Sequence, residues 1–285
     1  MTTMRKILLQ TTISQHPDDW TIDRFSVMTN YLAELKSPRG ERLYDVVARN
    51  RENLANGDDA VLSRIDQSDF DQVWLFGVDV GNGLSENDCS AIKTFMKGGG
   101  GLLTSRDHQD LGISFCTLGG VGDAHHFHSK NPPEEDSRQP DDTETPAISW
   151  PNYHSGRNGD FQVIQSRVHP VLHDGNGGTI GSLPAHPHEG AVSVPAGSNA
   201  QVIATGRSTL SGRPFNIAVA FDPGQEHGRA LADSSFHHFL DYNLDPASGC
   251  PSFVTEPAGD TLQKHPEAMH HSYAYFRNIA AWLSR

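Results

Sequence analysis

The chain has 285 residues, of which 36% are hydrophobic and 20% charged, enough apolar material for a large α/β domain. It contains no run of eighteen apolar residues, which excludes a membrane-spanning helix, and residues 7–9 are too short for the apolar part of a secretory signal. The excess of 35 acidic over 22 basic residues gives a net charge of -13, which disfavours a nucleic-acid partner.

Cysteine and histidine usage narrows the search for a site. Cys89, Cys116 and Cys250 form neither a CxxC pair nor an even-numbered disulfide framework, as expected for a protein of the reducing cytoplasm. The sixteen histidines stand out, because imidazole is a common metal ligand and acid–base group near neutral pH. We therefore look for places where histidines and carboxylates gather.

The first half of the chain alternates between strand and helix patterns. Short apolar runs predict strands over residues 6–11, 45–48, 72–76 and 102–104. Apolar residues at helical spacing predict a helix over residues 18–36, with Asp19 or Thr21 as its cap. A second helix is predicted to start at Ser85 and to stop at the four glycines 98–101. This alternation indicates a mostly parallel sheet with helices on both faces.

The second half shows a more antiparallel pattern. Apolar runs predict a hairpin of residues 201–205 and 215–221, a further strand over 229–233 and a last helix over 267–283 behind Pro266. Between the two halves, residues 123–160 are polar and without period. We interpret residues 130–146 as a long surface insertion in a single domain spanning 1–285, either a lid or a loop without a role.

In open α/β sheets, ligands bind beyond the carboxyl ends of the strands, so polar residues that follow strands are site candidates. The strand at 102–104 is followed by Arg106, Asp107, His108 and Asp110. His108 is a candidate acid–base group that Asp107 would orient, while Arg106 and Asp110 are candidate substrate contacts. The alternative is a structural turn in which Asp107 or Asp110 caps a helix over residues 113–116.

Two later segments also carry side chains suited to acid–base chemistry or ligand binding. Residues 183–190 carry histidine and glutamate on a backbone restricted by two prolines, and residues 233–241 place small hydroxyls and paired histidines directly after a predicted strand. Their candidate residues are His188, Glu189, Ser235, His237 and His238. Glu189 is the predicted acid–base partner of His108, and Ser235 and His237 are predicted substrate contacts.

A divalent metal ion is the expected cofactor, although the spacing does not specify which one. His126 and His128 alternate on an extended segment and would point to one side of it, as half of a metal site or in a solvated loop. The predicted ligands are His126, His128, His188 and His238. No nucleotide cofactor is expected, because the chain has neither GxGxxG after a strand nor a Walker lysine.

Several segments, taken in order, resemble the trehalose-utilisation (ThuA-like) family of the class I glutamine amidotransferase-like superfamily. They are FDQVWLFGVDVGNGLSENDCSAIKTFMKGGGGLL at 70–103, HPV at 169–171, HE at 188–189 and GRALADSSFHH at 228–238. The resemblance implies an α/β, flavodoxin-like three-layer sandwich with a mostly parallel central sheet and an antiparallel extension, and a role in carbohydrate metabolism. The glutaminase cysteine of that superfamily is missing, so release of ammonia from glutamine is not expected.

The leading hypothesis is an enzyme that performs general acid–base chemistry, with or without metal assistance, on a small polar substrate such as a sugar or keto-sugar. Hydrolase, lyase and isomerase reactions all fit this description. One alternative is a non-catalytic ligand-binding or assembly module. Another, a cysteine-nucleophile amidotransferase, requires Cys116 to be exposed with a lowered pKa. The sequence leaves open whether the chain forms a homo-oligomer.

Overall fold

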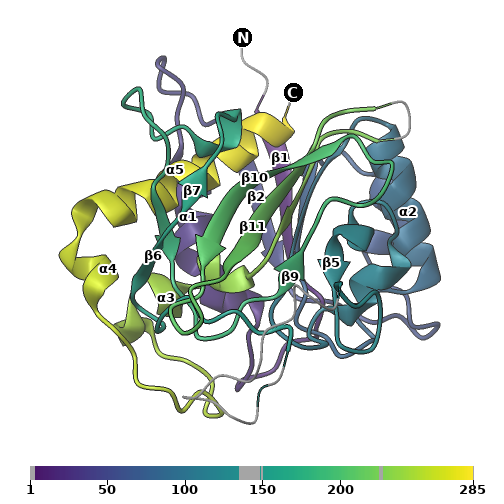
Figure 1. Ribbon diagram of the computed structural model, residues 1–285. Helices are drawn as coiled ribbons and strands as arrows, with labels where there is room; N and C mark the ends of the chain where they lie inside the picture. Colours follow the sequence, from purple (N-terminus) through teal and green to yellow (C-terminus); the bar gives the residue numbers. More distant parts are fainter. Residues whose placement is uncertain (1–3, 135–147, 149, 225–226, 285) are drawn as a thin grey trace.

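An eight-stranded sheet lies at the centre of the computed structural model, which describes residues 4–134, 148, 150–224 and 227–284 (Figure 1). Its strands are β1 (Arg5–Thr11), β2 (Tyr44–Arg49), β3 (Gln72–Phe76), β4 (Gly101–Ser105), β7 (Gln165–Ser166), β10 (Ala200–Arg207), β11 (Pro214–Phe221) and β12 (Ala230–Asp233). They lie in the order β2-β1-β3-β4-β12-β11-β10-β7.

The sheet is parallel in one part and antiparallel in the other. From β2 through β1, β3 and β4 to β12, every neighbouring pair is parallel. The pairs β12–β11, β11–β10 and β10–β7 are antiparallel. The prediction of a mostly parallel α/β sheet with an antiparallel extension is therefore confirmed.

Two short sheets lie beside the main one. One consists of β5 (His125–His126) and β9 (Ala191–Val192), and the other of β6 (Phe161–Val163) and β8 (Ser182–Pro184). Much of the insertion predicted at 130–146 lies outside the described residues. The short sheets matter for the site because β8 leads directly into the histidine segment that follows it.

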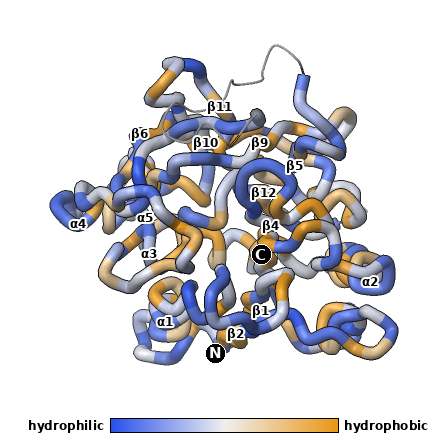
Figure 2. Tube along the Cα trace, turned by 90° about the horizontal axis from the view of Figure 1, so that it is seen from below, coloured by the Kyte–Doolittle hydropathy of each residue, from blue (hydrophilic) through white to orange (hydrophobic). Residues whose placement is uncertain are grey.

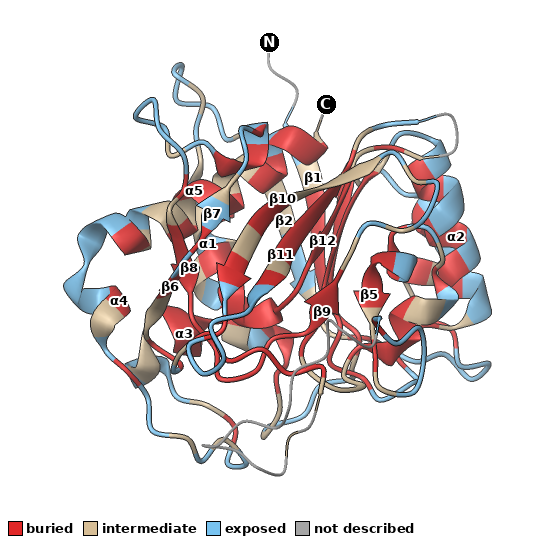
Figure 3. Cartoon of the chain, in the orientation of Figure 1, coloured by how far each residue is buried: buried red, intermediate tan, exposed pale blue. Residues whose placement is uncertain are grey.

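Helices cover both faces of the sheet, because side chains that alternate along each buried strand point to opposite sides. Ile7 and Leu9 of β1 face a core shared with α1 (Ser26–Glu34) and α5 (Pro266–Leu283). Leu8 faces a second core shared with α2 (Glu86–Lys97) and the 3-10 helix η2 (Leu62–Gln67). In Figure 3 the central strands β3, β4 and β12 are buried while the outer side of α2 is exposed, and in Figure 2 α2 alternates between hydrophobic and hydrophilic stretches.

Two helix predictions are confirmed at their ends. Ser85 and Asp88 form a capping box at the start of α2, and α2 ends at Lys97, directly before the glycines. Pro266 opens α5, which buries Phe276, Ala280 and Leu283 against the core. No helix among the described residues has the length and apolar character needed to cross a membrane.

The first predicted helix is shorter than expected. Residues 18–21 are not helical, the 3-10 helix η1 spans Ile22–Phe25, and α1 begins only at Ser26. Neither Asp19 nor Thr21 caps it. The first amides of α1, those of Ser26 and Val27, instead donate to the carboxylate of Asp241, which begins the short helix α3 (Asp241–Leu244). A distant carboxylate has replaced the local cap, which local spacing does not reveal.

Candidate active site

The segments that follow four neighbouring parallel strands meet at a cavity of about 460 Å³. Both chain ends lie at the opposite edge of the sheet, at the top of Figure 1. The cavity is lined by Asp19 and Trp20 after β1, Asp79 and Asn82 after β3, Asp107 and His108 after β4, and His237 after β12. His186 and His188, after β8, and Glu256 complete its polar lining. This is the strand edge at which α/β folds bind ligands.

Asp107 is the centre of the polar lining. Its Oδ2 lies 3.1 Å from Nδ1 of His108 and 3.5 Å from Nε2 of His237, and its Oδ1 lies 3.5 Å from Nδ1 of His186. The rings of His186 and His237 stack with centroids 3.5 Å apart, and the ring of His188 is 5.0 Å from that of His108. Four histidines thus surround one carboxylate.

Burial and charge set the protonation states of this cluster. Burial alone would raise the pKa of Asp107, but His108, His186 and His237 hold it well below the usual value, so the carboxylate is ionised. Burial lowers the pKa of His186 well below 6.5 and that of His188 to about 4, so both rings are neutral at pH 7. An ionised carboxylate beside neutral imidazoles can accept protons or bind a cation.

His108 differs from its neighbours in its access to solvent. The side chain of His108 is 17% exposed, whereas Asp107 and His237 are each 2% exposed. Nδ1 of His108 faces Asp107, which leaves Nε2 as the ring nitrogen able to exchange a proton with a molecule in the cavity. The prediction that His108 and Asp107 lie side by side at the carboxyl edge of the sheet therefore agrees with the structure.

The mouth of the cavity combines aromatic and polar groups. Trp20 packs its edge against the ring of His237, 5.1 Å away, and against Phe253, 6.1 Å away. Phe253 and Val80 are both largely exposed although they line the cavity. Glu256 lies 3.5 Å from Nε2 of His188 at the same opening. The opening can therefore contact both an apolar face and polar groups of one ligand.

Glu189 and His238 do not line this cavity, contrary to expectation. Both are fully buried, and His238 lies between Asp233 (2.9 Å from Nδ1) and Glu189 (3.6 Å from Nε2). Burial alone would lower the pKa of His238, but the two carboxylates raise it to about 10, so the ring is a cation. Tyr275 donates to Asp233 (2.7 Å) and Ser234 donates to Glu189 (2.8 Å). These contacts consume the groups predicted to act as base and metal ligand.

Arg106 also lies away from the cavity. Its guanidinium donates to the backbone carbonyls of Leu111 (3.0 Å), His126 (2.6 Å) and Gln109, and it covers the ring of Phe127 at 4.1 Å. The side chain is fully buried, which lowers its pKa to about 9. Arg106 thus holds the loop that follows β4 in place, and the structure does not make it available as a substrate contact.

Asp110 and Ser235 serve the backbone of neighbouring turns. Asp110 accepts a hydrogen bond from the amide of Ser129 (3.1 Å), and neither Asp110 nor Asp107 caps the 3-10 helix η3 (Ile113–Thr117). The alternative that Asp107 or Asp110 caps a helix over residues 113–116 is therefore wrong. Ser235 accepts from the amide of His237 (3.2 Å) and so shapes the turn that presents this histidine.

His126 and His128 do not join the other predicted metal ligands. Nε2 of His126 lies 2.6 Å from the hydroxyl of Ser193, and its Nδ1 lies 2.7 Å from the carbonyl oxygen of Asn131. His128 stacks on Trp150 with centroids 5.4 Å apart. His126 lines a different cavity, His188 lines the cavity at the carboxyl edge and His238 is buried between two carboxylates, so the four predicted ligands do not converge.

The structure adds residues that the sequence analysis did not single out. His186 belongs to the same HPH segment as His188, and the alternation of the two histidines was the available signal. Asp79 accepts from the amide of Gly81 (2.9 Å) and the hydroxyl of Ser114 (2.8 Å), which fixes the loop after β3. Asn243 contacts His237 six residues earlier and donates to Asn158 and the carbonyl oxygen of Ala185, which belong to distant segments that no local pattern relates to it.

The cysteine alternative finds no support. Cys116 is half-buried on η3, and burial raises the pKa of its thiol, the opposite of what a nucleophile requires. The described residues that line the cavity include no cysteine.

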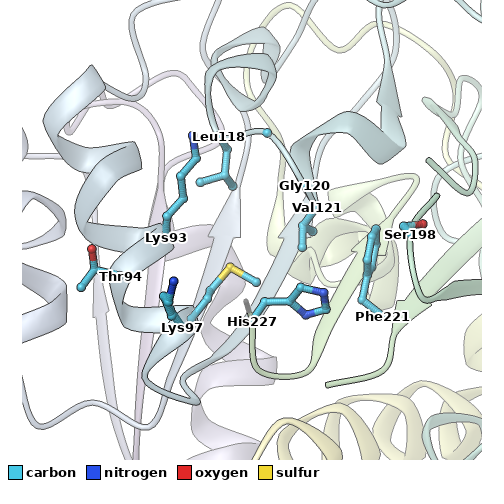
Figure 4. A pocket seen from close by; sticks show the side chains of 11 residues that line it. Lys93, Thr94, Lys97, Leu118, Gly120, Val121, Ser198, Phe221 and His227 are labelled. Carbon is cyan, nitrogen blue, oxygen red and sulfur yellow. The ribbon is translucent and has the colours of Figure 1, made fainter. Parts of the chain in front are cut away.

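A second cavity, of about 370 Å³, lies beside α2 (Figure 4). Lys93, Lys97 and His227 contribute its polar groups, and Phe221 is part of its apolar wall. The described residues around it include no carboxylate, so it has no acid–base pair comparable to His108 and Asp107. The cavity at the carboxyl edge is therefore the candidate active site.

Comparisons with known proteins agree on the fold. No family model and no curated protein matches the chain. The N-terminal domain of mmIFT52 is similar in structure, with a TM-score of 0.54 at 9% identity over 98% of this chain and 97% of that one. A putative ThuA-like protein from Bacteroides uniformis has a TM-score of 0.47 at 11% identity, covering 96% and 91%. The glutaminase domain of Trypanosoma brucei CTPS has a TM-score of 0.49 at 14% identity, over 99% of this chain and 97% of that one.

These similarities concern the class of fold. The chain has a flavodoxin-like α/β fold, and the solved structures that resemble it include ThuA-like proteins and amidotransferase domains. The fold that the resemblance implies is confirmed by the strand order of the sheet and by the similarity to the mmIFT52 domain. At identities of 9–14% it transfers no activity to this chain.

Proposed function

We propose that the chain is an enzyme that performs acid–base chemistry on a small polar substrate of carbohydrate type. The observation that carries the proposal is the pair formed by His108 and the ionised Asp107 at the floor of an open cavity. A carboxylate 3.1 Å from Nδ1 of an imidazole that reaches the cavity is the arrangement from which a histidine can act as a general acid or base.

The lining of the cavity supports the substrate class. Trp20 and Phe253 offer aromatic surface, while Asn82, Asn158 and Glu256 offer hydrogen-bonding groups around the same space. A sugar has C–H faces that pack on aromatic rings and hydroxyls that need such polar partners. The proposed reaction is proton transfer at a hydroxyl or next to a carbonyl carbon, as in hydrolases, lyases and isomerases.

A substrate panel tests this proposal. Nitrophenyl glycosides and aldonolactones report hydrolysis, and proton NMR in D2O reports exchange next to the carbonyl of keto-sugars. We expect turnover of at least one compound, and His108→Gln to lower its rate by about 10²–10⁴-fold with an unchanged melting temperature.

His270→Gln is the matched control, because His270 lies on α5 outside the cavity lining and its Nε2 contacts the backbone carbonyl oxygen of Asp174 at 2.8 Å. The His270→Gln variant should turn the substrate over at the wild-type rate. Turnover that survives in His108→Gln would contradict the proposal. Saturable binding of a sugar without any turnover would instead support the ligand-binding module.

A further inference from the structure

We propose that Asp107, His186 and His237 form a binding site for a divalent cation of borderline hardness, such as Zn²⁺, at the floor of the cavity. The site shares its location with the proposed function, but the inference rests on ligand geometry alone. These three residues replace the ligand set predicted from the sequence, because none of the four predicted ligands is among them.

The spacing of the three side chains fits one ion. Each offers one ligand atom, and these atoms lie within 4.8 Å of one another. Nε2 of His237 and Oδ2 of Asp107 are 3.5 Å apart. Tetrahedral coordination with bonds of about 2.1 Å places ligand atoms about 3.4 Å apart. The observed separation is therefore close to that across a shared metal ion.

The hydrogen bonds of Asn243 decide which nitrogen of His237 is available. The Asn243 amide nitrogen donates to the carbonyl oxygen of Ala185 (2.9 Å), which can only accept, and to Oδ1 of Asn158 (2.8 Å). Oδ1 of Asn243 must therefore face His237, and Nδ1 of His237 donates to it at 2.7 Å. In the neutral ring, Nε2 carries the lone pair that faces Asp107.

This arrangement leaves two electron-pair donors facing one another. Nε2 of His237 and Oδ2 of Asp107 are 3.5 Å apart, which is longer than a charge-assisted N–H···O hydrogen bond of about 2.7–2.9 Å, so the two atoms do not satisfy each other. In addition, Oδ1 of Asp107 is buried and has no hydrogen-bond partner among the described residues. Buried polar atoms are nearly always satisfied, so this orphaned oxygen indicates a missing ligand.

His186 is also held in position from outside the cluster. Nδ1 of His186 contacts the carbonyl oxygen of His188, which can only accept, so Nδ1 carries the proton and Nε2 keeps the lone pair that a metal needs. The ring stacks on that of His237. Ligands whose orientation is set by such outer contacts lose little freedom when they bind a metal. Two imidazoles and one carboxylate are a donor set typical of Zn²⁺ with a fourth position open.

Direct metal measurements test the inference without any substrate. Protein made without a polyhistidine tag is dialysed against Zn²⁺, passed through a desalting column and analysed by mass spectrometry for metals. We expect about one zinc ion per chain. Titration with Co²⁺ should give visible d–d absorption that saturates at the same stoichiometry. Less than about a tenth of an equivalent of zinc, without a cobalt spectrum, would overturn the proposal.

Variants assign the site to these residues. Asp107→Asn and His237→Gln should each weaken binding at least tenfold, and Asn243→Leu, which removes only the partner of His237, about 10–100-fold. His270→Gln should bind as the wild type does. Wild-type affinity in folded His237→Gln, checked by circular dichroism, would contradict the assignment.

The same variants separate the two proposals. Metal binding without turnover of any panel compound leaves the site standing and removes the proposed enzyme. If the protein binds no zinc and its turnover is unchanged without metal, the proposed enzyme is supported and the proposed metal site is contradicted.

Discussion

His238 shows how a single residue can be chemically prominent and still lie outside the reactive cavity. Its imidazolium is enclosed by Asp233 and Glu189, with every member of the group shielded from solvent. Removing one partner of such a buried group leaves uncompensated charge, which costs more than the intact pair contributes. The group therefore anchors β12 and the segment after β8 to each other behind the cavity.

We expect His238→Gln to lower the free energy of unfolding by roughly 3 kcal/mol, because two carboxylates then face each other without a cation. Urea denaturation at pH 7 measures this loss. Tyr275→Phe is the matched control: it removes one hydrogen bond to Asp233 and should cost only about 1 kcal/mol. Equal losses in the two variants would show that the cation is not the stabilising element.

At the scale of secondary-structure elements, the carboxylate of Asp59 joins a strand to a helix. Its carboxylate accepts from Arg49 at the end of β2 (2.7 Å) and from the amides of Leu62 (2.8 Å) and Val61 (2.9 Å) at the start of η2. Burial alone would raise the pKa of Asp59, but the hydrogen bonds from Arg49 and the backbone lower it below 3.8. One buried carboxylate thus caps a helix and joins it to a strand.

The lowered pKa of Asp59 predicts a pH dependence with a definite sign. The ionised form is favoured in the folded state, so its contribution is complete above the unfolded pKa of 3.8 and is lost as the pH falls through the lower folded value. The difference in unfolding free energy between wild type and Asp59→Asn should therefore be largest near pH 7 and shrink below about pH 4. Urea titrations at several pH values measure it; a difference that grows in acid would contradict the assignment.

At the scale of the whole molecule, the proposed metal site connects three parts of the chain. Asp107 follows β4, His186 follows β8 and His237 follows β12, so the site exists only when the sheet and its loops are assembled. A ligand that binds only the folded state stabilises it by mass action.

Zn²⁺ at a hundred times its dissociation constant should raise the unfolding free energy by about 2.7 kcal/mol. For a chain of this size that corresponds to an increase in melting temperature of roughly 5 °C. Thermal melts with and without Zn²⁺ measure the shift, which Asp107→Asn should abolish. An equal shift in that variant would place the stabilising ion elsewhere on the acidic surface.

Much of the architecture could be predicted, because it depends on local patterns. The buried strands appear as apolar runs, α2 as a periodic stripe behind Ser85, and the sheet edge as the place where polar residues follow strands. His108 and Asp107 were found in this way, since both follow one strand directly. Burial of alternating side chains determines these features whatever lies elsewhere in the chain.

The roles within the histidine-rich segments depended on the tertiary structure. HE at 188–189 and HH at 237–238 are adjacent pairs, and the structure sends one member of each to the cavity and the other into the buried group around Asp233. Neighbouring residues in extended or turn backbone point in different directions, and the partner of each is supplied by a distant segment. The sequence by itself determined that imidazoles and carboxylates would gather beyond the strands; long-range contacts such as those of His238 with Glu189 and of Asn243 with Asn158 decided which of them face the cavity.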